Sequence, residues 1–177
     1  MDKKDLRRTM KQLNRAVDPQ KRGCAEAAIF HEVEQLDAFR GARCVAFFAA
    51  LPDEVSTSET LRRWALEKRV VIPRVAGDEM DFYEYAPEKM VEGAFGIMEP
   101  AADATLCAPD EIDLIVVPGV AFTAQGARMG RGRGYYDKYL ARRGFRGLKV
   151  GVCYRHQIVA DLPLEPHDIV MDRVVSA

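Results

Sequence analysis

The sequence lacks a long hydrophobic run. None of its apolar stretches approaches the roughly 20 residues that a transmembrane helix needs. The first six residues, Met1 to Leu6, carry four charged side chains and have no apolar core of the kind found in a secretory signal. We therefore expect no membrane contact and a cytoplasmic location.

The sequence has only four cysteines, and no two of them have the spacing of a metal-binding or redox CxxC pair. The four cysteines lie far apart and form no CxxC pair: Cys24, Cys44, Cys107 and Cys153. This spacing favours neither a zinc site nor a disulfide framework. We expect reduced thiols with a structural role.

An excess of charge is also missing, because 26 lysines and arginines are balanced by 27 aspartates and glutamates. The net charge of −1 excludes a protein that binds nucleic acid through its overall charge. The charges are nevertheless unevenly placed. Residues 77–113 contain eleven acids and one base, whereas residues 126–146 contain seven bases and one acid. A local basic patch suits a small polyanion better than a long duplex, so we expect no nucleic-acid partner.

Helical and strand patterns alternate along the 177 residues, which suffice for a single domain, 1–177, with a core of its own. Short runs rich in Val, Ile and Phe predict buried strands at residues 43–50, 69–73, 113–118, 148–154 and 170–175. Helical periodicity predicts helices at residues 2–17, 19–39, 57–68 and 135–143. The alternation predicts an α/β fold with a mainly parallel sheet and helices on both faces.

Some local features of these elements can also be predicted. The first helix should bury one face, formed by Leu6, Met10, Leu13 and Val17. The second should contact the core through Cys24, Ala28, Val33 and Leu36. We expect the strand at 69–73 to end at Pro73, which has no N–H for a sheet, and residues 77–91 to form an edge hairpin.

Residues 117–140 concentrate glycine and arginine. Four glycines allow positive φ and a close backbone approach to a ligand: Gly126, Gly130, Gly132 and Gly134. Three arginines alternate with them: Arg128, Arg131 and Arg133. Backbone N–H groups and guanidinium forks both bind phosphate oxygens, and the helix expected from Tyr135 points its positive end the same way. The stretch predicts a cradle for a polyanion.

This cradle matches neither common phosphate loop. It lacks the Gly-Lys-Ser/Thr end of a Walker A loop, and its glycines are too closely spaced for the dinucleotide fingerprint. Composition alone leaves two alternatives. One is a solvated basic loop, and the other is an RNA contact with Tyr135 and Tyr136 as stacking faces.

A longer match points to a family. Pro118 to Phe122, Gly126 and the run from Arg128 to Asp137 closely resemble the signature of 5-formyltetrahydrofolate cyclo-ligase, also called 5,10-methenyltetrahydrofolate synthetase. Family members often carry Asp after the Phe, where this chain has Thr123, and we assign that position no role. The resemblance spans nearly the whole chain. It implies a Rossmann-like three-layer α/β/α fold related to CoA transferases and sugar-phosphate isomerases.

The resemblance also implies a reaction. This is the ATP- and Mg²⁺-dependent closure of 5-formyltetrahydrofolate to 5,10-methenyltetrahydrofolate, in which the formyl oxygen attacks the γ-phosphate and N10 closes the ring. Arg131 and Arg133 are the catalytic candidates, and we expect a monomer. Two alternatives stay open: a paralogue that binds folate or nucleotide without turnover, and an RNA-contacting module that uses the Arg-Gly loop.

Lys3 and Arg7 lie one turn apart near the start of the chain. Such a pair is usually a solvated stripe. Family members carry a Lys-x-x-x-Arg pair near the N-terminus that contacts ATP, although Lys4 and Arg8 offer the same spacing one residue later. The implied ATP-binding set is Lys3, Arg7, Arg128, Met129, Gly130, Arg131, Gly132, Arg133, Gly134, Tyr135 and Tyr136.

Glu54 follows the strand predicted at 43–50, and the run Glu54-Val55-Ser56-Thr57 resembles the family's second motif, in which the acid binds folate. A carboxylate suits the N–H donors of a pterin ring. Thr57 is expected to cap the next helix. The implied substrate-binding set is Ala49, Glu54, Arg131, Gly132, Arg133, Gly134 and Tyr135.

Asp137 falls in the first turn of a predicted helix, where an acid suits the helix dipole as well as a magnesium ion. The family has a metal-binding Asp after its Tyr-Tyr pair and a second one near the C-terminus, which implies Asp137 and Asp168 as metal ligands. Asp172 is expected to be structural, and His156 and His167 receive no role. Residues 93–100 resemble a further family segment with a tight turn.

Overall fold

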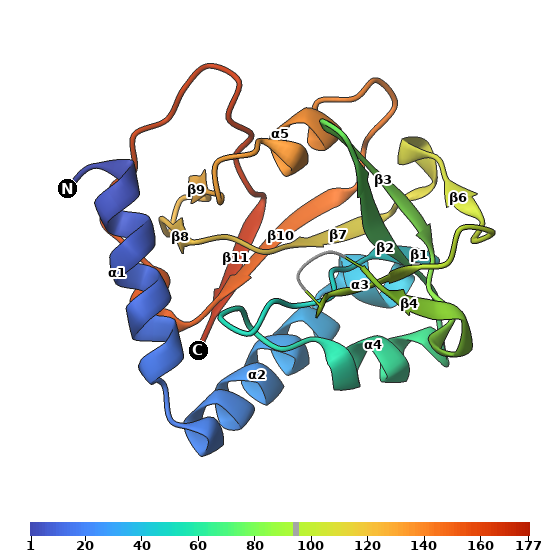
Figure 1. The fold of residues 1–177 in the computed structure, drawn as a ribbon, viewed down its shortest axis with the longest axis horizontal. Helices are drawn as coiled ribbons and strands as arrows, with labels where there is room; N and C mark the ends of the chain where they lie inside the picture. Colours follow the sequence, from blue (N-terminus) through green and yellow to red (C-terminus); the bar gives the residue numbers. More distant parts are fainter. Residues whose placement is uncertain (94–95) are drawn as a thin grey trace.

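The computed structural model describes residues 1–93 and 96–177 of the chain. Within these residues, a seven-stranded sheet forms the centre of the molecule (Figure 1). From edge to edge its strands are β11 (Arg173–Ser176), β10 (Leu148–Cys153), β7 (Leu114–Val117), β1 (Cys44–Ala46), β2 (Arg69–Ala76), β3 (Glu79–Glu84) and β6 (Leu106–Cys107). The first five pair in parallel, and β3 and β6 pair antiparallel. The mainly parallel sheet predicted from the sequence is confirmed.

Helices cover both faces of this sheet. One face carries α2 (Pro19–Glu34), α3 (Asp37–Gly41) and α4 (Ser58–Ala65), whose apolar side chains share a core with Val45, Val70 and Val116. The other face carries α5 (Tyr135–Leu140), whose Tyr139 and Leu140 share the second core. These layers match the three-layer α/β/α arrangement that the sequence implied.

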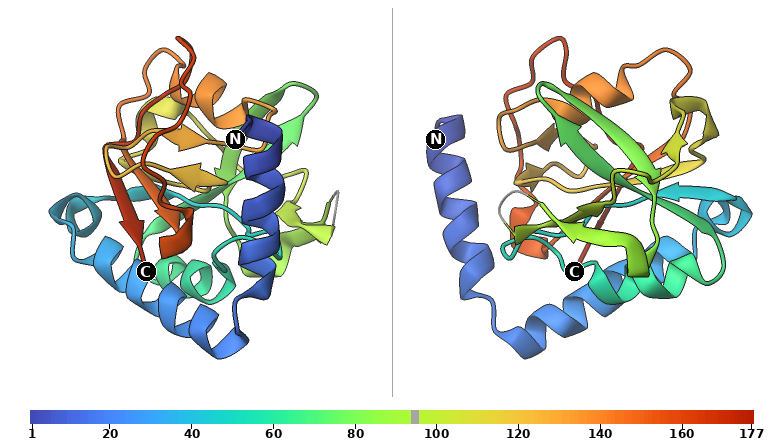
Figure 2. Two further views of the ribbon diagram at one scale, coloured as in Figure 1. Left: turned by 90° about the vertical axis from the view of Figure 1, so that its left-hand side faces the viewer. Right: turned by 45° about the vertical axis from the view of Figure 1, so that its right-hand side comes forward.

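Helix α1 (Lys3–Ala16) packs outside the layers. Its Met10 joins a third apolar cluster with Val120 and Met129, and the helix stands beside the loops at the carboxyl ends of the strands (Figure 2). Leu13, predicted to face inward, is 44% exposed, and Asn14 occupies the buried position instead. The face inferred from apolar residues alone was therefore wrong at this turn.

The helix predicted at 19–39 is two helices. Leu36 is extended, with φ −67° and ψ 133°, and separates α2 from α3. The core face of α2 is formed by Ile29, Phe30 and Val33, whereas the predicted contacts Cys24 and Ala28 are exposed. The large side chains decide the orientation, because burying Ile and Phe removes more apolar surface from water than burying Cys and Ala.

Pro73 does not end its strand. β2 continues to Ala76 because all of its residues from Val71 onward pair with β3, from Val71 opposite Glu84 to Ala76 opposite Glu79. On its other side β1 reaches only Val71, so Pro73 lies past the end of β1, where a missing N–H has no cost. The hairpin predicted within residues 77–91 is wrong, because residues 79–84 pair with the preceding strand β2. On its other side β3 pairs with β6, so β3 is not an edge strand either.

A separate two-stranded sheet joins β4 (Met90–Glu92) and β5 (Met98–Pro100). Residues 94 and 95 lie between these strands and outside the described residues, so the centre of the turn predicted at 93–100 is not described. Among the described residues, no helix is long and apolar enough to cross a membrane.

Candidate functional site

The candidate site lies at the carboxyl ends of β1 and β7. The chain leaves β1 for α4 on one face and leaves β7 for α5 on the opposite face. α/β proteins bind ligands in the crevice formed where the connections diverge in this way. Three loops meet here, residues 47–57 after β1, 118–134 after β7 and 154–157 after β10, and α1 stands beside them.

The loop after β7 begins with a hairpin of β8 (Ala121–Phe122) and β9 (Arg128–Met129). Gly126 has the expected positive φ, 102°, but what it approaches closely is another segment of this chain and not the position of a ligand. A Cβ at this position would lie 2.3 Å from the carbonyl oxygen of Met171. The Thr123 hydroxyl accepts the N–H of Ala127 at 3.1 Å, so Thr123, to which we assigned no role from the sequence, supplies an oxygen to the turn.

Arg128 is an inward-facing arginine, with a side chain only 7% exposed. Its Nε donates to the carbonyl of Pro118 at 2.7 Å, and its guanidinium lies over the Tyr136 ring at 5.1 Å. Burial lowers the pKa of this guanidinium, and the nearby Asp137 carboxylate opposes that shift. Gly130 does not take the expected positive φ. A Cβ there would come within 3.1 Å of an Arg128 nitrogen, so the Arg128 guanidinium would have to shift to accommodate it.

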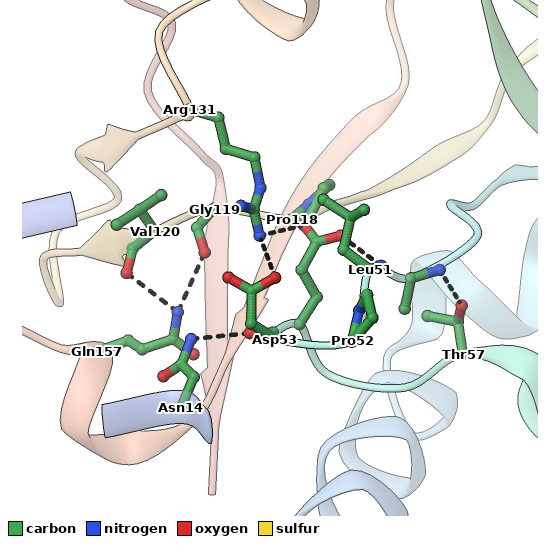
Figure 3. A network of polar contacts seen from close by, with 12 residues as sticks. Asn14, Leu51, Pro52, Asp53, Thr57, Pro118, Gly119, Val120, Arg131 and Gln157 are labelled. Carbon is green, nitrogen blue, oxygen red and sulfur yellow. Dashed lines mark hydrogen bonds and ion pairs between the residues drawn. The ribbon is translucent and has the colours of Figure 1, made fainter. Parts of the chain in front are cut away.

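Arg131 leaves the cradle and reaches the loop after β1 (Figure 3). Its Nη2 lies 3.0 Å from Asp53 Oδ1 and 3.8 Å from Glu54 Oε2. The two carboxylates are 9% and 11% exposed, whereas the Arg131 side chain is 41% exposed. One guanidinium therefore faces two nearly buried acids from the solvent side.

Glu54 is held by the turn that carries it. Its Oε1 accepts the Leu51 N–H at 2.8 Å. Burial raises the pKa of this carboxyl above its ordinary range, although the Leu51 N–H and the Arg131 charge act in the other direction. Glu54 also lines a cleft between α2 and its own loop, together with Arg22 and Glu26. The carboxylate is thus fixed in position, and its side chain is 11% exposed.

The predicted cap on α4 is absent. Thr57 stands at the N-cap position, but its side chain makes no capping hydrogen bond. Its hydroxyl instead donates to the carbonyl of Phe48 at 2.6 Å and accepts the Ala50 N–H at 3.1 Å. Thr57 therefore closes the loop that holds Ala49 and Glu54.

Helix α1 presents one of the two possible lysine and arginine pairs to the site. Arg7 Nε donates to the carbonyl of Gly130 at 3.0 Å, and Lys3 Nζ lies 3.4 Å from Glu165. Lys4 is exposed, and Arg8 pairs with Asp5 on the helix surface. Of the two registers, only Lys3 and Arg7 face other segments of the chain, Arg7 the loop after β7 and Lys3 the segment that carries Asp168.

Asp137 and Asp168 lie in adjoining turns, with side chains 18% and 14% exposed. Asp137 Oδ1 accepts the N–H of Ile169 at 3.0 Å, and Asp168 Oδ2 accepts the N–H of Glu165 at 2.8 Å. Each carboxylate thus keeps one oxygen with no backbone donor among the described residues. His167 lies 3.6 Å from Asp168 and is largely exposed.

The remaining predicted residues surround the mouth of the cradle. Arg133 is exposed, and Gly132 and Gly134 have φ values of 105° and 71°. The Tyr135 hydroxyl donates to the carbonyl of Gly77 at 3.1 Å, which ties the cradle to the β2–β3 hairpin. Together with the position of Tyr136 against Arg128, this contact weakens the case for open stacking faces.

Two buried polar residues beneath the site were missed by the sequence analysis. Asn14 donates from Nδ2 to the carbonyl of Asp53 at 2.9 Å, and Gln157 donates to the carbonyls of Gly119 and Val120 at 3.1 and 3.0 Å (Figure 3). They connect α1, the loop after β1 and the loop after β7. The sequence offered one hint of this: Asn14 lies four residues after Met10, so both fall on the same face of α1.

Comparisons with known proteins agree with this geometry. The model of the 5-formyltetrahydrofolate cyclo-ligase family matches residues 1–177. A 5-formyltetrahydrofolate cyclo-ligase of Saccharomyces cerevisiae is 30% identical, over 96% of this chain and 92% of its own. An Aquifex aeolicus 5,10-methenyltetrahydrofolate synthetase structure is 34% identical, covers 99% of this chain and 90% of its own, and superposes with a TM-score of 0.89. A Mycoplasma pneumoniae synthetase, 23% identical over 99% and 98% of the two chains, shares the fold with a TM-score of 0.80.

Proposed function

The chain belongs to the 5-formyltetrahydrofolate cyclo-ligase family, and from that premise we propose that it uses ATP and Mg²⁺ to close 5-formyltetrahydrofolate to 5,10-methenyltetrahydrofolate, releasing ADP and phosphate. The observation that carries the proposal is the meeting of Arg131, from the glycine and arginine loop, with Glu54, from the loop after β1. A phosphate-binding cation and a pterin-binding acid thereby share one crevice.

The chemistry needs activation of a poor leaving group. In the proposed reaction, the formyl oxygen attacks the γ-phosphorus and the bond to ADP breaks. N10 then attacks the formyl carbon and loses its proton, and the oxygen departs with phosphate. Little covalent work falls to the protein, so its contribution is positioning and charge stabilisation.

The nucleotide would be bound between α1 and the cradle. Arg7 already contacts the Gly130 carbonyl and lies under Gly132, so its guanidinium stands at the edge of the loop. Lys3 lies on the same side of α1. Arg131 and Arg133 are the two cradle arginines with exposed side chains, and we assign them to the charge that develops on the transferred phosphoryl group.

The acids near the cradle fit a magnesium ion. Asp137 and Asp168 offer hard oxygen ligands from adjoining segments, which the hydrogen bond from the Ile169 N–H to the Asp137 carboxylate holds together. Mg²⁺ prefers one or two carboxylates with water and substrate phosphate, and when bound it neutralises phosphate charge. Asp137 and Asp168 would hold it beside the buried guanidinium of Arg128.

The reduced pterin would lie against the loop after β1. Glu54 would accept its N–H donors, with Ala49 as a neighbour and Tyr135 on the cradle side. Both Ala49 and Tyr135 are half-buried, so each can contact a ligand without unfolding its segment. A cytoplasmic location and a monomer stay predictions.

The direct test is the absorbance of the methenyl product, followed with ATP and Mg²⁺ together and with each omitted. We expect product only in the complete mixture. Arg131→Ala should lower turnover at least about a hundredfold, the usual cost of losing one transition-state donor. Near-normal turnover in that variant would remove Arg131 from the mechanism. Binding of both ligands without product in the wild type would favour a paralogue that binds without turnover.

A further inference from the structure

At the centre of the site, the carboxylates of Asp53 and Glu54 both face the guanidinium of Arg131. The Arg131 guanidinium is within hydrogen-bonding distance of Asp53, at 3.0 Å, but only within 3.8 Å of Glu54. One Glu54 oxygen is occupied by the Leu51 N–H. The other, Oε2, is the atom that faces Arg131, and no closer partner engages it among the described residues.

Asp53 is anchored from below, independently of Arg131. Its carbonyl accepts from the amide of Asn14, which is only 4% exposed. Because the Asn14 nitrogen points to Asp53, the Asn14 oxygen faces His156 Nε2, which must carry the proton of that hydrogen bond. The preceding carbonyl, that of Pro52, accepts from Arg22 at 2.8 Å. The backbone at Asp53 is thus tied to α1, α2 and the turn after β10.

Resting on the proposed function, we propose that Asp53 is a positioning residue. It holds the Arg131 guanidinium away from Glu54 and thereby leaves one Glu54 oxygen open to the N–H donors of the pterin.

The physical reason is the strength of charged hydrogen bonds. A guanidinium without Asp53 would move the short distance to the nearest remaining carboxylate, which is Glu54, and close a charge-assisted pair with it. Glu54 would then have both oxygens occupied, one by Leu51 and one by Arg131. The pterin would have to displace that pair before it could bind.

A double-mutant cycle tests this role. Asp53→Asn keeps the shape of the side chain and removes its charge. It should weaken equilibrium binding of 5-formyltetrahydrofolate about tenfold, the loss expected when one charged hydrogen bond is disturbed. In an Arg131→Ala background no guanidinium can move, so the same substitution should change binding less than about twofold. An equal loss in both backgrounds would show that Asp53 merely supports the loop, and would overturn the proposal.

Calorimetric binding is the chosen readout because it does not need turnover. Wild-type protein that binds the folate but yields no methenyl product would contradict the proposed function while the cycle stays readable. Asp53→Ser is the second variant, should Asp53→Asn not fold, and the same difference between backgrounds is expected. Glu111→Gln is the matched control, since it removes the charge of an ion pair with Arg69, the first residue of β2 and thus at the end of that strand opposite the site, and should leave binding unchanged.

Discussion

At the scale of single residues, Glu54 affects both substrate binding and the stability of the fold, and these two respond to pH in opposite ways. Burial disfavours its charged form and raises its pKa, while Arg131 and Arg128 favour that form and Asp53 disfavours it. Accepting N–H donors from a pterin requires the ionised carboxylate. The ionised Glu54 carboxylate therefore favours pterin binding, but its burial in that form lowers the stability of the fold.

We expect the KM for 5-formyltetrahydrofolate to rise as the pH falls, beginning above the range in which an ordinary glutamate protonates. The cause is protonation of Glu54, which removes an acceptor from the site. Steady-state kinetics between neutral and acid pH measure it. Glu54→Gln should bind weakly at every pH and lose this acid limb. A limb that persists in Glu54→Gln would assign the titration to another group.

The stability of the fold depends on pH in the opposite direction. A carboxyl whose pKa is raised by folding contributes stability below its unfolded pKa, and this contribution is lost as the pH rises through the folded pKa. Glu54→Gln should therefore gain stability relative to the wild type as the pH increases across that window. Urea unfolding at several pH values would show this, and a constant difference would contradict it.

The cysteines differ in exposure in a way their spacing could not predict. Cys24 is exposed on α2, and Cys44, Cys107 and Cys153 are buried. Burial also raises the pKa of Cys153 to about 12, which suppresses its thiolate. We expect one thiol to react quickly with Ellman's reagent in the folded protein and all four to react after unfolding. Cys24→Ser should abolish the fast phase. A second fast thiol in the folded state would be inconsistent with this packing.

Residues with a local pattern could be predicted, and residues that act through distant partners could not. Glu54 and Arg131 lie in runs that carry recognisable signatures. Asp53 and Asn14 lie 39 residues apart in sequence and become informative only when the fold brings them together. Asn14 is also a polar residue on a buried helix face, where an apolar pattern gives no signal.

At the scale of elements, the β8–β9 hairpin depends on a single close approach. Gly126 has a φ of 102°, and its α-carbon faces the Met171 carbonyl with no room for a methyl group. The Met171 N–H in turn donates to the Gly126 carbonyl at 2.8 Å. The cradle and the C-terminal segment that carries Asp168 therefore share one tight contact.

Gly126→Ala should lower the free energy of unfolding by at least about 3 kcal/mol, because backbone strain at positive φ adds to a steric clash. Gly77→Ala is the matched control. Gly77 also has a positive φ, 62°, but nothing lies within 4 Å of its added Cβ, so only about 1 kcal/mol of strain is expected. Urea denaturation measures both. Equal losses at the two positions would show that the Met171 contact yields easily.

Most elements could be predicted because apolar runs and helical periods are local properties. The exceptions depended on neighbours. Pro73 was taken as a strand end, yet β2 continues because it pairs with β3, and the missing N–H of Pro73 has no cost because β1 ends opposite Val71. Helix α2 turns Ile29 and Phe30 inward, and this choice is made by packing against Trp64 and Phe47 rather than by the period of the helix itself.

At the scale of the whole molecule, the site is assembled from segments that are far apart in the sequence. Arg7 meets Gly130 across 123 residues, and Asn14 meets His156 across 142. Helix α1 contacts the sheet layers mainly through a small apolar cluster and these polar contacts. A ligand that binds α1 and the loops at the same time would therefore strengthen the attachment of α1 to the rest of the molecule, which rests on few contacts.

This arrangement predicts strong stabilisation by nucleotide. At a concentration of about 100 Kd, a ligand that binds only the folded state adds about 2.7 kcal/mol. For a chain of this size that corresponds to a rise in Tm of about 5–10 °C. Differential scanning calorimetry with ATP and Mg²⁺ measures it, and EDTA should remove most of the shift if Asp137 and Asp168 act through the metal.

Neighbouring variants on α1 make this test specific. Arg7→Ala should lose most of the ATP-dependent shift in Tm, because its guanidinium stands at the edge of the cradle. Arg8→Ala removes the same charge one residue later, from a side chain that pairs with Asp5 on the surface, and should retain the shift. Because both substitutions alter net charge and helix propensity equally, a difference between them must come from the face of α1 that each residue occupies. Loss of the shift in Arg8→Ala alone would place the nucleotide on the face of the helix that carries Arg8.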